Sequence, residues 1–470
     1  PVDQIICNAE TTSVTFTTEN TGGTTTYAWT NDTTSIGLGA LGAGDIPSFA
    51  GVNTGTSPVT ATLIVTPTFT ENGVSCTGPT ETFTITVNPT GQVDEIQDQI
   101  LCNTNATTAI TFTTNNTGGT TTYSWTNDTD SIGLSATGSG DIASFTAVNN
   151  STDPVTATIV VTPSFEGCDG PTETFTITVN PTAGMNDPQD MVVCNAEVTS
   201  SVAFTTNNTG GTTTYTWTND TPSIGLAASG SGDLPSFTAA NTNTQPITAT
   251  ITVTPLFTDD INCDGISETF TITVNPTAQV DDPADQIICN DISTSVSFTT
   301  NNTGGTTTYS WINDTDSIGL SATGSGDISF NAVNNSTDPV TATIVVTPNF
   351  EGCDGPTETF TITVNPTGQV DEIQDQVLCN TEATTAITFT TDNTSGTTTY
   401  SWVNDTPSIG LAATGTGDIA SFTAVNSGTS PVTATIVVTP TYTNAGVSCD
   451  GPTETFTITV NPTAQVNDPV

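Results

Sequence analysis

The sequence contains no lysine, arginine or histidine in 470 residues. The absence of histidine and lysine removes the usual proton-transfer groups and Schiff-base chemistry, and the absence of arginine removes the usual clamp for phosphate. The 47 acidic residues leave a net charge of -47, which repels nucleic acid and anionic lipid. We therefore expect a protein with no catalytic residues and no nucleic-acid partner, not an enzyme.

Long apolar stretches are missing as well. No run of 18 apolar residues is present, and no secretory leader stands at the start of the sequence. We expect no membrane insertion in this segment. Both ends stop within a repeated pattern, which suggests a piece of a longer array whose secretion signal and anchor lie elsewhere. No helical period appears, which favours an all-β protein.

What the sequence does contain is one pattern repeated five times. Each copy carries Cys-Asn, Tyr-x-Trp, Ser-Ile-Gly-Leu, a second cysteine and Thr-Phe-Thr-Ile-Thr-Val-Asn-Pro in the same order. A period of about 90 residues is the size of one β-sandwich domain and is too long for a solenoid repeat. We call the copies units 1 to 5 and place them at residues 1–90, 91–182, 183–277, 278–367 and 368–463, with 464–470 as the start of a next repeat.

Each unit is predicted to form about seven strands. Thr alternates with apolar residues, as in Thr82 to Val87, which is typical of a strand with one buried face. Unit 4 lacks one residue after Asp327 that the other units have, for example Ala143 in unit 2. Because a one-residue slip exchanges the two faces of a strand, we predict a β-bulge here in units 1, 2, 3 and 5 but not in unit 4.

The ten cysteines fall two per unit. This even count predicts one disulfide inside each unit, formed in an oxidising compartment, with free buried thiols as the alternative. A loop of about 65–70 residues closed in this way contributes about 4 kcal/mol in the chain-entropy model. Zinc is disfavoured because histidine and CxxC pairs are absent. The predicted pairs are Cys7 and Cys76, Cys102 and Cys168, Cys194 and Cys263, Cys289 and Cys353, and Cys379 and Cys449.

The ordered landmarks resemble the PKD-like domain repeats of Bacteroidota surface proteins, over essentially the whole chain. Such repeats occur in very long adhesins, including the gliding-motility adhesin of flavobacteria. The resemblance implies a tandem array of five Ig-like/PKD-like β-sandwich domains forming an extended rod. It also implies export by the type IX system, display on the outer surface of a bacterial cell and no catalytic residues. A surface or polysaccharide receptor would bind through regions outside this segment, whose own partners are neighbouring repeats.

The acidic junctions between units are candidate calcium sites, since oxygen ligands between tandem sandwiches often stiffen an array. Solvated acidic loops are the alternative, and no other cofactor is expected. The candidate ligands are Asp94, Glu95, Asp98, Asp187, Asp190, Asp281, Asp282, Asp285, Asp371, Glu372 and Asp375.

Three hydroxyls follow an aspartate in a short motif similar to Bacteroidota O-glycosylation sites: Thr33, Ser131 and Ser317. The five tryptophans are predicted to pack in the cores against the disulfides rather than to stack on sugars. The sequence thus favours a rod of roughly 200 Å, judged from strand lengths, that serves as the stalk of an adhesin. A self-assembling filament subunit and the spacer of a secreted enzyme are the alternatives.

Overall fold

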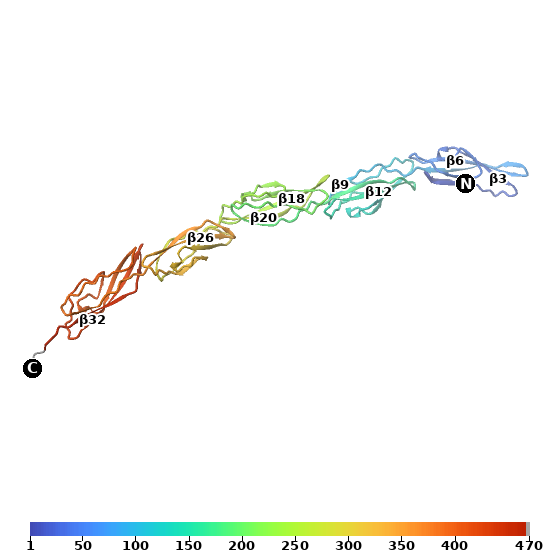
Figure 1. Cartoon of the computed structure of the whole chain (residues 1–470). Coiled ribbons are helices and arrows are strands. Elements are labelled where there is room, and N and C mark those ends of the chain that lie inside the picture. The colour runs from blue at the N-terminus through green and yellow to red at the C-terminus, as the bar shows by residue number, and fades with distance from the viewer. Residues whose placement is uncertain (467–470) are drawn as a thin grey trace.

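The computed structural model describes residues 1–466 and places the five units end to end in a gently curved rod (Figure 1). The four residues 467–470, part of the expected next repeat, lie outside the described residues. Every regular element in residues 1–466 is a strand or a single 3-10 turn, so the fold is all-β as predicted. Among these residues, no helix has the length and hydrophobicity needed to span a membrane.

Unit 1 shows the large sheet that all units share, together with a second layer that forms strands only in units 1 and 4. Its large sheet has the strand order β1-β8-β6-β3-β4, with β7 also paired to β6, and a small second layer pairs β2 with β5. Strand β1 runs parallel to β8, whereas the other pairs are antiparallel. The strands are β1 (Gln4–Cys7), β2 (Thr11–Val14), β3 (Thr24–Asn31), β4 (Leu41–Ala43), β5 (Ile46–Ala50), β6 (Val59–Glu71), β7 (Val74–Thr77) and β8 (Glu81–Asn88).

The other four units repeat this order along the rod. Unit 2 has β9 (Gln99–Cys102), β10 (Thr121–Asn127), β11 (Thr137–Ser139), β12 (Val155–Phe165), β13 (Cys168–Asp169) and β14 (Glu173–Asn180). Unit 3 has β15 (Met191–Cys194), β16 (Thr212–Asn219), β17 (Ser229–Ser231), β18 (Ile247–Asp259), β19 (Ile261–Asp264) and β20 (Glu268–Asn275). Unit 4 has β21 (Gln286–Cys289), β22 (Ser293–Val296), β23 (Thr307–Asn313), β24 (Thr323–Ser325), β25 (Ile328–Asn331), β26 (Val340–Phe350), β27 (Cys353–Asp354) and β28 (Glu358–Asn365). Unit 5 has β29 (Gln376–Cys379), β30 (Thr397–Asn404), β31 (Thr414–Thr416), β32 (Val432–Asn444), β33 (Val447–Asp450) and β34 (Glu454–Asn461).

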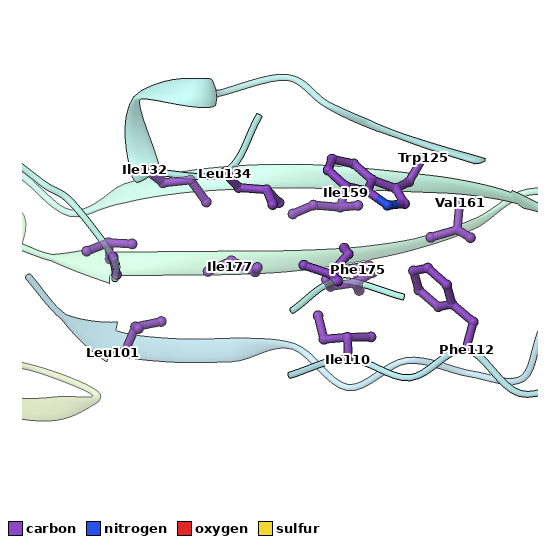
Figure 2. Close-up of a cluster of buried hydrophobic side chains, with 14 residues drawn as sticks. Leu101, Ile110, Phe112, Trp125, Ile132, Leu134, Ile159, Val161, Phe175 and Ile177 are labelled. Atoms are coloured by element: carbon purple, nitrogen blue, oxygen red, sulfur yellow. The ribbon is translucent and has the colours of Figure 1, made fainter. Parts of the chain in front are cut away.

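The period-2 alternation places one row of apolar side chains in each core. On β14, Phe175, Ile177 and Val179 are buried while the intervening threonines are only half-buried. Trp125 of β10 lies in the same cluster as Phe112 from the facing layer (Figure 2). The tryptophans of all five units are buried, so the prediction that they belong to the cores is confirmed.

The small layer differs between units in a way that the sequence analysis only partly predicted. In unit 1 the pairing of β2 with β5 shifts register, which is the expected bulge. In unit 4 the pairing of β22 with β25 is continuous, also as expected. In unit 2 the two bridges Ala106–Thr146 and Ile110–Ile142 are separated by equal numbers of residues on both strands, and units 3 and 5 have the same spacing.

The prediction of a bulge was therefore wrong for units 2, 3 and 5. In these units the partner segment also carries one additional residue, so that eight positions separate Cys102 from Ile110, whereas seven separate Cys289 from Val296. Because each of the two paired segments is one residue longer, the register between them is kept. In unit 1 only the segment after Asp45 is longer, so a bulge results. The gap in the unit 2 ladder is bridged by the Thr107 hydroxyl, which accepts from the Phe145 N–H at 3.0 Å.

A long hairpin determines how the units meet. In unit 1, the 13-residue strand β6 continues through a tight turn into β7, which pairs with the last part of β6. The next strand, β8, pairs with the first part of β6. The tip of this hairpin lies at one end of the unit. The end of β8 at Asn88 and the end of β1 at Cys7, which are paired in register, lie at the other end. Each unit consequently carries its two cysteines at opposite ends.

Candidate functional site

Disulfide bonds join neighbouring units at all four junctions. The first cysteine of one unit bonds to the second cysteine of the following unit, with Cα–Cα distances of 5.4–5.5 Å. The four pairs are Cys7–Cys168, Cys102–Cys263, Cys194–Cys353 and Cys289–Cys449. Within the described residues, Cys76 of unit 1 and Cys379 of unit 5 are free and exposed.

The prediction of one disulfide inside each unit was wrong. Cys7 lies level with Asn88, whereas Cys76 lies level with Phe69 near the tip of the hairpin. The strand β6 separates these levels by about eleven residues, which at ~3.3 Å per residue is roughly 35 Å. A disulfide requires Cα atoms within about 7 Å, so the two cysteines of a unit cannot bond to each other.

The chain between units packs closely against the hairpin of the following unit. The Gly91 N–H donates to the Cys168 carbonyl oxygen at 3.0 Å, and Gly368 repeats this contact with Cys449 at 3.2 Å. A Cβ atom on Gly170 would overlap the Gly91 carbonyl oxygen. In units 2 to 5 the glycine that follows the second cysteine by two residues is therefore required by the approach of two backbones.

Hydrogen bonds hold each junction on a second side. At the junction of units 1 and 2, the Thr117 N–H donates to the Thr56 carbonyl oxygen at 2.7 Å. The same bond recurs from Thr209 to Thr152, from Thr303 to Thr244 and from Thr394 to Thr337 at 2.8–3.2 Å. The Asn180 side chain also donates to the Asp259 carbonyl oxygen at the next hairpin, at 2.7 Å. Each junction is thus fixed by the chain, the disulfide and these hydrogen bonds.

The hairpin tips are buried at the four junctions, whereas the corresponding residues at the two ends of the rod are exposed. Phe165 and Cys168 in unit 2 are 0% and 2% exposed, and their counterparts in units 3 to 5 are buried to the same degree. In unit 1 the corresponding Phe69 is only half-buried and Cys76 is exposed. At the other end, Ala464 is exposed although its counterparts Ala183 and Ala278 are buried. The preceding unit therefore covers each internal hairpin tip.

The acidic residues proposed as calcium ligands do not converge. Asp94 accepts hydrogen bonds from Thr113 at 2.6 Å and from Asn115 at 3.0 Å, and Asp281 makes the same two bonds with Thr299 and Asn301. Asp371 accepts from Thr390. The side chains that have no such bond are exposed: Glu95, Asp187, Asp282 and Glu372.

The second acidic position of each junction serves a different strand. Asp98, Asp190, Asp285 and Asp375 accept the backbone N–H of Thr176, Thr271, Thr361 and Thr457 respectively, at 2.6–2.7 Å. The carboxylates thus fasten the inter-unit segment to two different parts of the unit. Among residues 1–466, no three acidic or cysteine side chains gather into a group that could hold a metal ion. Calcium binding at the junctions stays a prediction. The described acidic residues do not form an assembled calcium site.

Another aspartate, in the Asn-Asp-Thr motif after each tryptophan strand, closes a loop in every unit. Asp220 accepts the Thr250 N–H at 2.8 Å and the Thr221 hydroxyl at 2.8 Å. These bonds lower the pKa of Asp220, the backbone bond from Thr250 being the larger cause. The pKa values of Asp32, Asp128, Asp314 and Asp405 are lowered for the same reason.

The predicted glycosylation sites lie around this motif. Thr33 is half-buried and its hydroxyl donates to Asp32 at 2.8 Å, whereas Ser131 and Ser317 are exposed in the following 3-10 turns. Glycosylation at these positions stays a prediction, and the exposed serines are the more accessible of the three.

The prediction that the tryptophans pack against the disulfides was wrong. In unit 2 the Trp125 ring covers Gly138 of β11, where a Cβ atom would overlap the ring, and its Nε1–H donates to the Gly140 carbonyl oxygen at 3.2 Å. The glycine-rich corner at Gly138 and Gly140 therefore leaves the space that the tryptophan ring occupies. The disulfides lie at the ends of the units and are not part of these cores.

The comparisons with known proteins found only distant similarities to solved structures. No protein-family model matches the chain, and no curated protein matches it. Among solved structures, the human Desmocollin-1 ectodomain is 12% identical with a TM-score of 0.25, covering 100% of this chain and 99% of that chain. Sidekick-1 immunoglobulin domains 1-5 are 10% identical with a TM-score of 0.27, covering 98% of each chain. Drosophila N-cadherin EC1-4 is 14% identical with a TM-score of 0.25, covering 78% of this chain and 99% of that chain.

These solved chains are Ig-like and cadherin-type extracellular repeats, and at such TM-scores we draw no functional argument from them. The fold assignment rests on the strand order and on the two-layer cores of the chain itself.

Proposed function

We propose that this chain is a non-catalytic, load-bearing stalk that holds other parts of an adhesion protein away from a cell. The observation that carries the proposal is the pattern of disulfides, each of which ties a unit to the next. A string of domains joined only by flexible chain would lengthen whenever one domain unfolds. The disulfides described here prevent most of that lengthening.

The disulfides create a short covalent route along the rod. From Cys7 the route crosses to Cys168, follows the chain to Cys194 and crosses to Cys353. It passes along only about 26 residues of backbone between two junctions that lie two units apart, with each residue spanning at most ~3.3–3.6 Å. A second, interleaved route crosses from Cys102 to Cys263 and from Cys289 to Cys449.

Those residues are already extended in the folded rod. Residues 168–180 contain β13 and β14, which run the length of unit 2, and residues 181–194 run along unit 3 and end in β15. Because a strand is close to the maximum length of a polypeptide, unfolding of units 2 and 3 adds little length to this route. Tension is therefore carried by two nearly taut covalent paths even when a sandwich opens.

The compartment follows from the same chemistry. Disulfides persist in oxidising surroundings and are rare where cellular thiols are kept reduced, so they support an extracellular location. The high negative charge keeps neighbouring rods apart at short range in salt, where the screening length is about 8 Å.

The finer identity is part of the proposal. The repeat landmarks support a stalk segment of a very long Bacteroidota adhesin that acts in attachment or gliding. Such an adhesin would be exported by the type IX system and displayed on the outer cell surface. Labelling the segment with an antibody on living cells of its source tests this. Label that travels along the surface supports a gliding adhesin, whereas static label on surface threads contradicts gliding and supports a fixed fibre.

Single-molecule pulling between units 1 and 5 tests the load-bearing role. We expect the oxidised chain to show little lengthening as internal units unfold, and the reduced chain to show full steps of about 90 residues, or roughly 300 Å each. Full-length steps from internal units in the oxidised chain would overturn the proposal.

A matched pair of variants separates the disulfide effect from the loss of a thiol. Cys194→Ser with Cys353→Ser, combined with Cys102→Ser and Cys263→Ser, interrupts both covalent routes and should release additional length on unfolding. Cys76→Ser removes a thiol that forms no bond within the described residues and should leave the extension unchanged. Equal extensions for the two variants would contradict the assigned route.

A further inference from the structure

The junction between units 2 and 3 buries a side-chain oxygen that has no partner. Asn180, at the end of β14, is 0% exposed, and its Oδ1 atom forms no hydrogen bond among the described residues. The Nδ2 atom of the same amide donates to the Asp259 carbonyl oxygen, at the hairpin of unit 3, at 2.7 Å. Rotating the amide would set an oxygen against that carbonyl, so the atom without a partner is the oxygen.

The junction between units 4 and 5 shows the partner that this oxygen has elsewhere. Asn365 is the counterpart of Asn180, and its Nδ2 atom donates to the Asn444 carbonyl oxygen at 3.4 Å. The Asn444 side chain in turn donates to Asn365 Oδ1 at 3.0 Å, so both halves of that amide are satisfied. In unit 3 the residue that contributes the carbonyl is Asp259, and an ionised carboxylate only accepts hydrogen bonds. The donor found between units 4 and 5 is therefore missing between units 2 and 3.

The Asp259 carboxylate also lacks a hydrogen-bond donor. The residues at this position in units 2 and 4 are Glu166 and Glu351. Each of their carboxylates accepts a backbone N–H of its own unit, from Thr120 at 2.6 Å and from Thr306 at 2.8 Å. Asp259 is one methylene shorter and half-buried, and its carboxylate accepts no hydrogen bond within the part of the chain that the structure describes. Two oxygen acceptors, one of them charged, thus belong to a contact that supplies no donor.

We propose that this contact binds a calcium ion, held by Asn180 Oδ1 and the Asp259 carboxylate and otherwise by water. Burying an amide oxygen and an acidic group without partners is costly, and a cation removes both costs. The chain has no side chain that could serve as this cation, because it contains no lysine, arginine or histidine. Amide and carboxylate oxygens are ligands of calcium, which accepts irregular geometry, whereas magnesium requires a near-ideal octahedron.

The disulfide at this junction holds the two ligand-bearing segments together. Asn180 lies opposite Cys102 across β14 and β9. Cys102 bonds to Cys263, which lies in the same hairpin as Asp259. The ion therefore does not have to bring the two units into contact. Because the site has only one carboxylate, we expect weak binding, with a Kd of about 10⁻⁴–10⁻³ M as in extracellular calcium modules.

The site is separate from the acidic residues of the inter-unit segments. Most of those carboxylates already accept hydrogen bonds from their own unit, and none of them is a ligand here. The other hairpins carry Glu or Asn in place of Asp259, so the site occurs at one junction only. It makes the stability of this junction depend on calcium, which goes beyond the stalk function and does not rest on it.

Amide hydrogen exchange of the full oxidised chain tests the proposal, with the junction of units 4 and 5 as internal control. Exchange in the unit 3 hairpin, residues 257–263, is compared with exchange in residues 442–449, in calcium chloride and after chelation. At about 5 mM calcium, which exceeds the expected Kd, mass action should slow exchange in the unit 3 hairpin by about tenfold. Residues 442–449 should not change. Magnesium and sodium chloride at equal ionic strength control for screening of the charged surface.

Two substitutions move the site from one junction to the other. Asp259→Asn supplies the missing donor, so its hairpin should be protected without calcium and should not respond to it. Asn444→Asp removes the donor at the other junction and should make residues 442–449 respond to calcium. Asp187→Asn removes an exposed carboxylate from the segment that follows Asn180 and should leave the response of unit 3 unchanged.

Three outcomes overturn the proposal. Equal exchange with and without calcium in the wild type would show that water satisfies the Asn180 oxygen. An equal effect of the three salts would show screening and an adventitious ion only. A calcium response that persists in Asp259→Asn would place the ion elsewhere. None of these results affects the stalk function, which the pulling experiment tests through the disulfides.

Discussion

Asp220 and its four counterparts show how a single side chain closes a loop in every unit. The carboxylate accepts the Thr250 N–H, which lies 30 residues further along the chain, and this bond lowers the pKa of Asp220. A group whose pKa is lower in the folded state stabilises the fold above its unfolded pKa of about 3.9. That stabilisation is lost as the pH falls through the folded pKa.

We therefore expect Asp220→Asn to destabilise unit 3 at pH 7 and to lose this effect in acid. The measurement is the melting temperature of both proteins between pH 7 and pH 2. The difference should be largest at neutral pH, should begin to shrink below about pH 4, where the carboxyl of the unfolded chain takes up a proton, and should vanish below the lowered pKa of the folded state. Asp187→Asn, at an exposed acid without a hydrogen bond to a neighbouring strand, is the control and should change little. A difference that grows in acid would contradict the assignment.

Gly170 tests the approach of two backbones at a junction. Gly170→Ala places a methyl group onto the Gly91 carbonyl oxygen, so one of the two segments has to move. Overpacking of this kind costs about 1–3 kcal/mol. Gly39→Ala, where nothing lies within 4 Å, is the matched control. Thermal unfolding should show a lower transition for the first variant only, and equal transitions would mean that the junction is looser than described.

The small layer shows how two strands compensate each other's length. Unit 2 has one more residue than unit 4 on each of the two segments, and the bridges at their ends keep the same spacing. Deleting Ala143 alone should shift the register and expose part of the core, because the faces of a strand alternate. Deleting Ala106 as well should restore most of the stability by recreating the arrangement of unit 4.

Chemical denaturation of the three proteins checks this prediction. The single deletion should lower the midpoint and the double deletion should recover it. A double deletion that is less stable than the single one would show that the two segments do not compensate. Unit 1, which tolerates a bulge, indicates that the cost of the single deletion is moderate.

The disulfides make the rod more than a sum of five sandwiches. Each closes a loop of about 160 residues, which corresponds to about 5 kcal/mol in the chain-entropy model. Cys7→Ser with Cys168→Ser should therefore lower the free energy of unfolding of units 1 and 2 by several kcal/mol. Cys76→Ser should not, since Cys76 is free among the described residues. Urea unfolding monitored by tryptophan fluorescence measures both, and a similar loss in the two variants would contradict a junction-specific effect.

Much of the architecture follows from the sequence. The 90-residue period, the alternation of Thr with Val, Ile and Phe, and the turn glycines predict five sandwiches in a row, because local patterns determine strands and cores. The buried tryptophans and the uninterrupted small layer of unit 4 were predicted for the same reason. The bulge prediction failed in units 2, 3 and 5 because the length of one strand does not fix its register; the cysteine-to-Ile spacing of the partner segment compensates it.

The partners of the cysteines were decided only by the tertiary structure. Pairing within a unit and pairing between neighbours use the same residues at the same period, so counting and spacing cannot separate them. In unit 2 the length of β12 separates them, because it carries the hairpin tip with Cys168 away from the end of β9 at Cys102 and toward the preceding unit. The sequence by itself determined that there are five acidic β-sandwiches with two cysteines each. The direction of the strands determined that these cysteines bind the sandwiches to one another, because a rigid strand keeps them apart within a unit.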